Sequence, residues 1–294
     1  MRYTEFGKTG YNISAVTYGG VISMQDGQEA SYRYVPWAIE NGVNYFDVAP
    51  GYGDAQEKLG NALKPYRKDI YLACKTQKRT RPEAENDFRE SMRLLHTDHF
   101  DVYQLHAMST DEDIEKAFGK NGVVEMIDKL KTEGYIRKAG ITAHSERIAV
   151  KALEMYDFDT VLFPFNWHMN LEYGFGNRLL KIAHERGKGL LSMKSMIDRA
   201  WTDGDDRSKY PKSWCRPFDT DNEPDMLVAA MKYVWSLGVN TIIPPGNFDH
   251  FRFAVNHIDE IVDSPINDRE LDSLKDHLSE VRGKPFFGKE MYNW

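Results

Sequence analysis

The chain has 294 residues, of which 41% are hydrophobic and 28% charged, and its net charge is −7. These values are typical of a globular protein, and the acidic balance argues against a nucleic-acid partner, which usually needs a basic face. No apolar run approaches the roughly 20 residues that span a bilayer, so we expect no membrane partner either. The N-terminus lacks a signal-peptide core, and Cys74 and Cys215 show no disulfide or zinc spacing, which favours the cytoplasm.

Predicted elements begin with a hairpin over 1–14, whose turn is Lys8-Thr9-Gly10, followed by a strand over 13–18. After Gly19-Gly20, helical and strand patterns alternate along the chain. Seven further strands are expected near 44–47, 70–75, 100–105, 138–142, 160–165, 189–194 and 240–243. Helices are expected near 28–41, 54–64, 82–95, 122–133, 146–156, 174–186, 223–237 and 247–263.

Eight strand–helix units of this kind predict an α/β fold, a single (β/α)₈ barrel domain over 1–294. Two stretches, 107–121 and 196–221, are longer than usual loops. Both should leave from the carboxyl ends of the strands and help to enclose a substrate. The C-terminal extension, 284–294, is rich in aromatic residues and should fold back over the end of the barrel.

Four side chains lie at or just after the ends of successive predicted strands. Asp47, Lys75 and His106 end the second, third and fourth strands, and Tyr52 follows in the loop after Asp47. Helices separate these strands, so the strands should run parallel and side by side. Their carboxyl ends then open at one mouth, where parallel α/β folds place their chemistry.

This combination suits a tyrosine that acts as a proton donor. The pKa of a free tyrosine is about 10, and the nearby Lys75 ammonium should lower the pKa of Tyr52. Asp47 would hold Lys75, and His106 would form a hydrogen bond with Tyr52 or with the substrate oxygen. Such a site can protonate the oxygen of a carbonyl group during reduction, and a nicotinamide cofactor is the natural source of the hydride.

The segment 44–60, Asn-Tyr-Phe-Asp-Val-Ala-Pro-Gly-Tyr-Gly-Asp-Ala-Gln-Glu-Lys-Leu-Gly, resembles the active-site signature of the aldo-keto reductases. Cys-Lys-Thr (74–76), Asp-Val-Tyr-Gln-Leu-His (101–106) and Gly-Tyr-Ile-Arg-Lys-Ala-Gly-Ile-Thr (134–142) match the family as well, and the similarity runs from about Tyr3 to Asn256. It implies reduction of a small aldehyde or ketone by NAD(P)H. Tyr52 would be the general acid, supported by Lys75, Asp47 and His106.

The resemblance also implies where the cofactor binds. Its adenosine end should lie near the start of the eighth helix, where Arg252 and Asn256 have the spacing that the family uses. Asn247 can cap this helix, whose free N–H groups favour phosphate. Gly246 stands where NADP-preferring members often carry a lysine. We expect NADP on the strength of Arg252, with NAD as the alternative.

The nicotinamide side departs from the family pattern. Where the family commonly carries Ser-Asn and a Gln to hold the carboxamide, this chain has Thr142, Ala143 and Leu162. Thr142 still offers a hydroxyl group. His144 and Asn166 are the candidates to replace the two missing polar partners.

Other residues are expected around the same mouth. Gly20 would let the backbone approach a ligand closely, although a tight turn is the alternative. Lys194 would meet either a cofactor phosphate or a loop carboxylate. The candidate walls of the substrate pocket are large apolar side chains, namely Met108, Trp167, Trp201 and Trp214.

Two other functions compete with reduction. The first is a cofactor-binding regulatory or accessory subunit with little turnover, which the altered carboxamide side favours and the four catalytic-type residues disfavour. The second is a metal-dependent barrel hydrolase, with Asp47, His106 and His144 as conceivable ligands. No paired His-x-His or comparable metal spacing supports the hydrolase. No heptad or interface strip predicts an oligomeric state.

Overall fold

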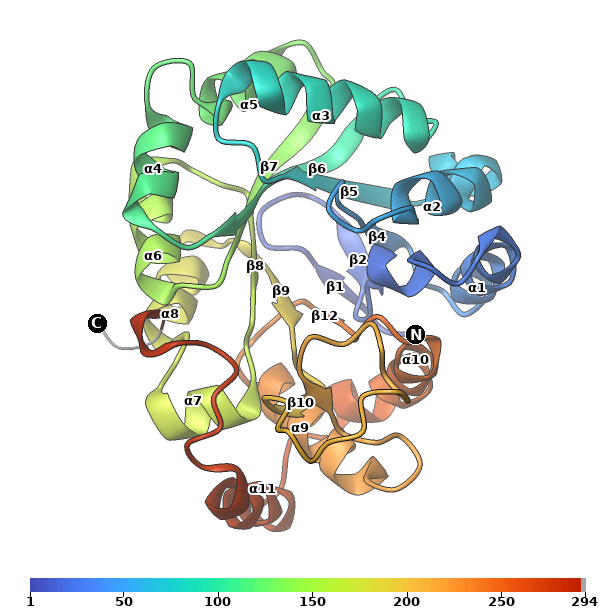
Figure 1. The fold of residues 1–294 in the computed structure, drawn as a ribbon, viewed down its shortest axis with the longest axis vertical. Helices are drawn as coiled ribbons and strands as arrows, with labels where there is room; N and C mark the ends of the chain where they lie inside the picture. Colours follow the sequence, from blue (N-terminus) through green and yellow to red (C-terminus); the bar gives the residue numbers. More distant parts are fainter. Residues whose placement is uncertain (292–294) are drawn as a thin grey trace.

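Eight parallel strands stand side by side at the centre of the computed structural model, which describes residues 1–291 (Figure 1). A parallel bridge between Val16 and Ile242, and a hydrogen bond of 2.9 Å from Thr17 N to Ile242 O, close the barrel. The predicted (β/α)₈ barrel is confirmed. Its strands, in chain order, are β3 (Tyr18–Gly19), β4 (Tyr45–Asp47), β5 (Tyr71–Thr76), β6 (Phe100–Met108), β7 (Ile136–Ala143), β8 (Thr160–Phe163), β9 (Gly189–Met193) and β12 (Thr241–Ile243).

The eight predicted helices surround these strands, with small shifts at their ends. Their apolar stripes face the barrel: on α3, for example, the Phe88 ring lies 5.4 Å from Phe100 and 5.1 Å from Tyr103. The helices are α1 (Gln28–Glu40), α2 (Ala55–Leu63), α3 (Arg81–Leu94), α5 (Val123–Thr132), α6 (Glu146–Met155), α8 (Asn177–Arg186), α9 (Pro224–Ser236) and α10 (Phe248–Asp263).

Three α-helices and three short 3₁₀ helices were not predicted. The expected loop 107–121 contains α4, which begins with a capping box between Thr110 and Asp113. A second capping box, between Asn267 and Glu270, begins α11. These elements are α4 (Asp111–Phe118), α7 (Trp167–Tyr173), α11 (Asp268–Val281), η1 (Gly20–Ser23), η2 (Lys64–Asp69) and η3 (Lys289–Met291).

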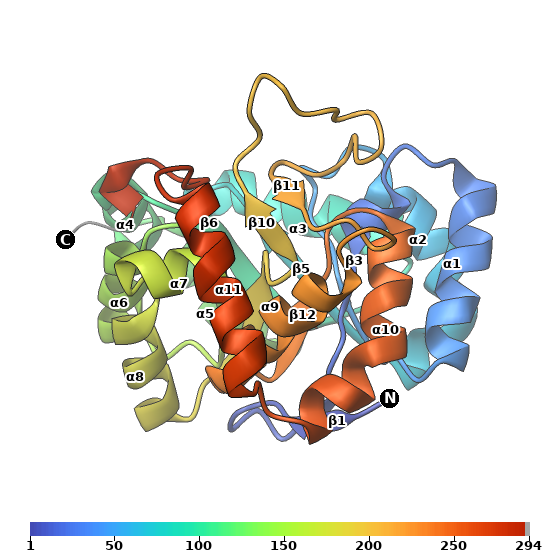
Figure 2. The ribbon, with the colours of Figure 1, turned by 90° about the horizontal axis from the view of Figure 1, so that it is seen from below.

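The N-terminal hairpin covers one end of the barrel, as Figure 2 shows. Its strands β1 (Tyr3–Glu5) and β2 (Asn12–Ser14) pair antiparallel, as predicted. Phe6 and Ile13 are buried against the barrel interior. The single strand expected over 13–18 is not formed. Residues 12–14 belong to the hairpin, Tyr18–Gly19 forms the barrel strand, and Val16 joins the barrel through an isolated bridge to Ile242.

The opposite end of the barrel is covered by residues 194–223, which we call the roof segment. It rises above the strands in Figure 2 and contains a small antiparallel pair, β10 (Ile197–Arg199) and β11 (Arg216–Pro217). The carboxyl ends of the barrel strands open beneath it. The candidate site was predicted from the sequence at this end of the barrel.

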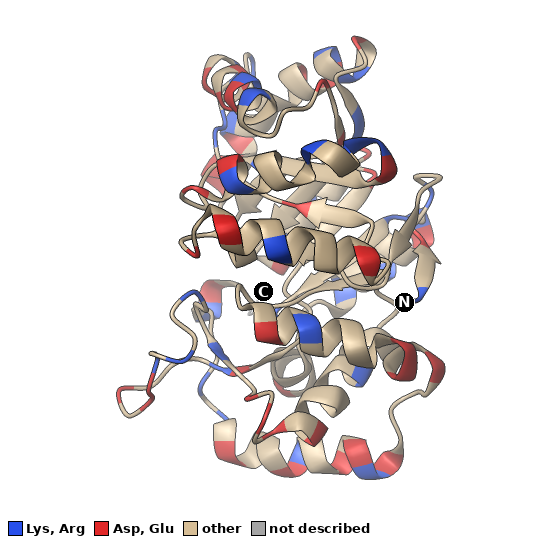
Figure 3. Cartoon of the chain, turned by 90° about the vertical axis from the view of Figure 1, so that its right-hand side faces the viewer, with Lys and Arg blue, Asp and Glu red and all other residues tan. Residues whose placement is uncertain are grey.

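The outer surface mixes both signs of charge. On the face drawn in Figure 3, Lys and Arg lie among Asp and Glu along the helices. No helix within residues 1–291 combines the length and apolar character needed to cross a membrane.

Candidate active site

The strand register brings the four predicted catalytic residues to one end of the barrel. Asp47 ends β4, Lys75 lies on the neighbouring β5, and His106 lies near the end of β6. Tyr52 follows Asp47 in the loop that leads to α2. Side chains from three adjacent strands and one loop therefore meet at a single point.

Asp47 and Lys75 form a buried ion pair at this point. Their side chains are 3% and 1% exposed, and Lys75 Nζ donates to Asp47 Oδ1. Burial lowers the pKa of Lys75, but the charge of Asp47, the nearby Tyr52 and the hydrogen bond to Asp47 together outweigh it, and the net pKa is raised. Lys75 is therefore a fixed ammonium group at neutral pH.

The Tyr52 ring lies against this ammonium and borders the cleft. Lys75 Nζ is 5.4 Å from the Tyr52 ring centroid, and the His106 ring stands perpendicular to Tyr52 at 5.8 Å. Burial raises the pKa of Tyr52, and Lys75 offsets only part of that rise. The sequence predicted a net lowering of the pKa of Tyr52. This prediction is wrong, because desolvation of the phenol dominates. Tyr52 therefore keeps its proton at neutral pH.

His106 is neutral across the physiological range. Burial, followed by the charge of Lys75, lowers the pKa of His106 to about 2. The next residue, Ala107, has a φ of 55°, a left-handed conformation that is uncommon for alanine. Two side chains hold this turn: Arg79 Nη2 donates to the His106 carbonyl at 2.8 Å, and Thr142 Oγ1 accepts from Ala107 N at 2.7 Å.

A cleft opens beside Tyr52. It runs from the ends of the barrel strands, under the roof segment, to the turn before α10. Of the predicted residues it brings together the following: Asp47, Tyr52, Lys194, Trp214 and Gly246. Lys212 and Cys215 of the roof segment also line it, and neither was predicted as a site residue.

Only one of the four predicted pocket walls reaches the cleft. Trp214 is 67% exposed, and its ring lies 6.4 Å from that of Tyr52. Trp167 and Met108 are fully buried in the core. Trp201 lines a separate hollow and donates to Ser213 O at 2.9 Å. The prediction that these three residues line the pocket is wrong, because each of them packs within its own part of the chain.

The residues expected to hold the carboxamide are engaged elsewhere. Asn166 is fully buried, caps α7 and donates to the carbonyls of Lys194 and Ile197 at 2.9 and 2.8 Å. Thr142 is 1% exposed and supports the turn after His106. The His144 ring lies 5.3 Å from that of Phe287. None of these three side chains lines the cleft, which corrects the expectation for Thr142 and Asn166.

Lys194 lies beneath the C-terminal tail rather than beside a carboxylate. Its Nζ is 5.8 Å from the Phe286 ring centroid and 5.5 Å from that of Phe287. The tail therefore folds back over the edge of the barrel mouth, as expected, through residue 291. The predicted extension also included 292–294, which lie outside the described residues.

The start of α10 has the predicted cap. Asn247 Oδ1 accepts from Asp249 N at 2.8 Å. A β-carbon on Gly246 would lie 2.3 Å from Val21 Cγ1, so a lysine could not stand there without displacing η1. Arg252 is 54% exposed and pairs with Asp249 at 3.1 Å. Further along α10, Asn256 is exposed, and Gly20 packs against Val48 without lining the cleft.

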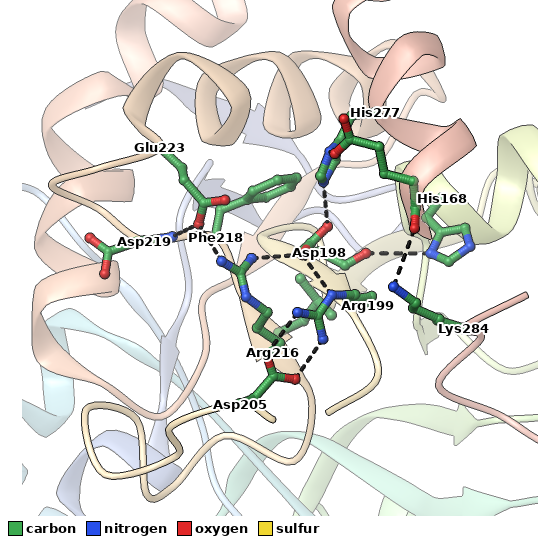
Figure 4. A network of polar contacts seen from close by, with 12 residues as sticks. His168, Asp198, Arg199, Asp205, Arg216, Phe218, Asp219, Glu223, His277 and Lys284 are labelled. Carbon is green, nitrogen blue, oxygen red and sulfur yellow. Dashed lines mark hydrogen bonds and ion pairs between the residues drawn. The ribbon is translucent and has the colours of Figure 1, made fainter. Parts of the chain in front are cut away.

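The roof segment is anchored on one side by a buried carboxylate. Figure 4 shows Asp198, whose oxygens accept from Arg216 at 2.6 Å and from His277 of α11 at 2.8 Å. Arg216 also donates to Glu223 at 2.9 Å. The carboxylate therefore joins two parts of the roof to the last helix.

The other side of the roof is tied to η1. Lys212 Nζ donates to Ile22 O at 2.8 Å and to Asp26 at 2.7 Å. The roof thus spans the cleft from α11 to η1. Among residues 1–291, no three or more His, Cys, Asp or Glu side chains gather in a way that could hold a metal ion.

Comparison with known proteins identifies the family. The model of the Aldo/keto reductase family matches residues 17–242. Aldo-keto reductase YhdN of Bacillus subtilis is 24% identical over 243 residues, which are 74% of this chain and 71% of that protein. Uncharacterized oxidoreductase YqkF, also of Bacillus subtilis, is 27% identical over 180 residues, but the match spans only 56% of each protein.

Solved structures share the fold. The holo form of aldo-keto reductase AKR11C1 from Bacillus halodurans superposes with a TM-score of 0.72 and 19% identity, covering 99% of each chain. Because the family model matches well over half of the residues, this chain belongs to the aldo/keto reductase family.

Proposed function

We propose that this protein reduces an aldehyde or ketone to an alcohol with a hydride from a nicotinamide dinucleotide, and that Tyr52 is the general acid. The observation that carries the proposal is the position of Lys75 Nζ, 5.4 Å from the Tyr52 ring centroid at the edge of the cleft. A protonated phenol beside a fixed ammonium is suited to give up its proton and to carry the resulting charge.

The proton moves between Tyr52 and the substrate oxygen. As the carbonyl is reduced, its oxygen gains negative charge, the Tyr52 O–H bond breaks and a new O–H bond forms on the product. Lys75 stabilises the phenolate that remains, and Asp47 keeps the Lys75 ammonium in place. The Trp214 ring lies near that of Tyr52 and would form one wall for the substrate.

His106 has a different role from Tyr52. The pKa of His106 is lowered to about 2, so its imidazole ring is uncharged at neutral pH and cannot act as an imidazolium acid. It therefore acts as a neutral hydrogen-bond partner that orients the substrate oxygen. The turn held by Arg79 and Thr142 sets the direction of its ring.

When bound, the dinucleotide would supply the hydride. The cleft suits an extended anion because Lys194 and Lys212 line it and Gly246 adds no side chain to it. The first N–H groups of α10 add a site that favours phosphate. We propose NADP as the cofactor because Arg252 offers a cation on α10, with NAD as the alternative.

Stopped-flow oxidation of bound NADPH by 4-nitrobenzaldehyde tests this function. The expected result is a single-turnover loss of NADPH absorbance that requires the aldehyde and persists in EDTA. If NADPH binds, as measured by fluorescence titration, but no hydride is transferred to this or to other reactive aldehydes, the proposal is wrong.

The accessory-subunit function remains the second candidate for one structural reason. Thr142 and Asn166, the polar residues expected on the nicotinamide side, are buried and committed to other groups. A dinucleotide would then be held mainly by its phosphate and adenosine ends. Tight NADPH binding without turnover is the result that would favour this candidate.

A further inference from the structure

The buried carboxylate of Asp47 has a second partner besides Lys75. Gln104, which is fully buried on β6, donates from Nε2 to Asp47 Oδ2 at 2.6 Å. An ionised carboxylate only accepts hydrogen bonds, so the amide must present its NH₂ group to it. Each oxygen of Asp47 therefore has its own donor, and both donors are buried.

The barrel interior is built to admit this amide. Along the sheet Lys75 pairs with Gln104, Gln104 with Gly140, and Gly140 with Thr160. A β-carbon on Gly140 would lie 2.8 Å from Gln104 Cγ and 2.4 Å from Thr160 Oγ1. Glycine at this position leaves the space that the Gln104 side chain occupies.

We propose that Gln104 is a positioning residue of the active site, which holds Asp47 so that one carboxylate oxygen stays on Lys75 and the ammonium stays beside Tyr52. This inference rests on the proposed role of Tyr52. It adds a fifth residue to the acid–base group, acting through Asp47 and Lys75 rather than on the substrate.

Within residues 1–291, the Gln104 side chain forms one hydrogen bond, to Asp47. Its other amide atom, Oε1, has no partner there, so Asp47 is the polar group that orients the amide. Without Gln104, one oxygen of a buried carboxylate would lose its donor, which is costly for a charged group. Asp47 would then be free to turn both oxygens towards Lys75, which would shift the ammonium from its place beside Tyr52.

The groups that act on Asp47 come from three elements. On β4 and β5 these are Tyr45, Cys74 and Lys75, and in the loop after β4 it is Tyr52. Only Lys75 among them carries a positive charge. Loss of the Gln104 hydrogen bond would therefore leave Lys75 as the sole side-chain donor to this buried carboxylate within residues 1–291.

Two variants and one control test the proposal. Gln104→Leu removes the amide with a similar volume, and Gln104→Glu replaces it with a group that donates only when protonated. Thr160→Val is the matched control, because it alters the same layer of the interior at a hydroxyl that has no partner within residues 1–291. Crystal structures of the three variants show where Asp47 and Lys75 lie relative to Tyr52.

We expect the Asp47 carboxylate to turn and Lys75 Nζ to move relative to the Tyr52 ring in Gln104→Leu, and both to stay in place in Thr160→Val. Because this readout needs no turnover, an unchanged arrangement of Asp47, Lys75 and Tyr52 in Gln104→Leu overturns the proposal even if the enzyme proves inactive. If wild-type protein transfers no hydride, the proposed function fails separately.

The pH profile of kcat shows whether the effect reaches Tyr52. Gln104→Leu should lose about tenfold in kcat, with little change in KM, at every pH. Gln104→Glu should lose activity as pH rises, because Glu at this position can donate to Asp47 only while it is protonated. A Gln104→Glu profile of the same shape as wild type, or an unchanged kcat in Gln104→Leu, would mean that Gln104 only fills space, and would overturn the proposal.

Discussion

His277 Nε2 lies 2.8 Å from Asp198 Oδ1, and this contact ties the last helix of the barrel to the roof over the cleft. The hydrogen bond to Asp198 raises the pKa of His277, although partial burial opposes the rise, and Glu280 adds to it. Arg216 and Arg199 face the same carboxylate from the roof side. The anchor of the roof should therefore depend on pH.

We expect His277→Gln to lower thermal stability more at acidic than at alkaline pH. A histidine whose folded pKa is raised contributes its full stability below the unfolded pKa of about 6.5, and loses it as pH rises through the folded pKa. The difference in Tm between wild type and His277→Gln should thus be largest near about pH 5.5 and shrink towards about pH 9.

Differential scanning fluorimetry across this range measures the effect. His96→Gln is the control, because His96 bonds to Asn61 far from the roof. A Tm difference for His277→Gln that does not vary with pH would show that its charge is not what anchors the roof.

Tyr52→Phe tests the assigned acid. The change removes one hydroxyl group and keeps the ring that faces Lys75, so NADPH affinity should stay nearly unchanged. Carbonyl reduction should fall by at least about 10²-fold, because the substrate oxygen loses its proton donor. Tyr32→Phe, at an exposed position on α1, is the control. Near-normal single-turnover rates in Tyr52→Phe would mean that another group supplies the proton.

Lys75→Met should abolish most activity for a different reason. It removes the charge that stabilises the phenolate and leaves Asp47 buried without its counter-ion, which costs about 3–5 kcal/mol of stability. The double variant Asp47→Asn with Lys75→Met should recover much of the lost Tm without recovering activity. If kcat returned together with Tm, Lys75 would be a structural residue only.

The barrel and its catalytic end were predictable because both depend on local, repeated patterns. Amphipathic helices and apolar strands set the order of units, and parallel register then brought Asp47, Lys75 and His106 together. The helix α11 carries signals that the prediction overlooked: a capping box at Asn267 and Glu270, and buried residues spaced as on a helix.

The cleft walls were not predictable in the same way. Trp167, Trp201 and Trp214 look alike in the sequence, yet one is fully buried, one lines a separate hollow in the roof segment and one lies near Tyr52. Their places depend on how an irregular segment folds over the barrel, and long-range contacts such as Lys212 with Asp26 decide that. The predicted lowering of the pKa of Tyr52 was wrong for a related reason, because the burial of Tyr52 depends on the whole site.

Lys212→Met should weaken NADPH binding by about tenfold. Lys212 lines the cleft beside Gly246 and ties the roof to Ile22 and Asp26, so the change removes a cation and loosens the cover over the bound dinucleotide. Lys209→Met is the matched control, because Lys209 lies in the same segment but pairs with Asp219 outside the cleft. Equal dissociation constants for the two variants, measured by fluorescence titration, would remove Lys212 from the cofactor site.

Arg252→Ala should separate the two cofactors. Arg252 is 54% exposed and its nearest partner is Asp249 at 3.1 Å, so a 2′-phosphate would have to compete with that carboxylate. We expect the variant to lose about five- to tenfold in NADPH affinity and little in NADH affinity, since only NADPH carries the extra charge. Asp249→Asn, which frees the guanidinium, should strengthen NADPH binding. An equal loss for both dinucleotides in Arg252→Ala would place Arg252 at the adenine or ribose instead, and would make NAD the better candidate.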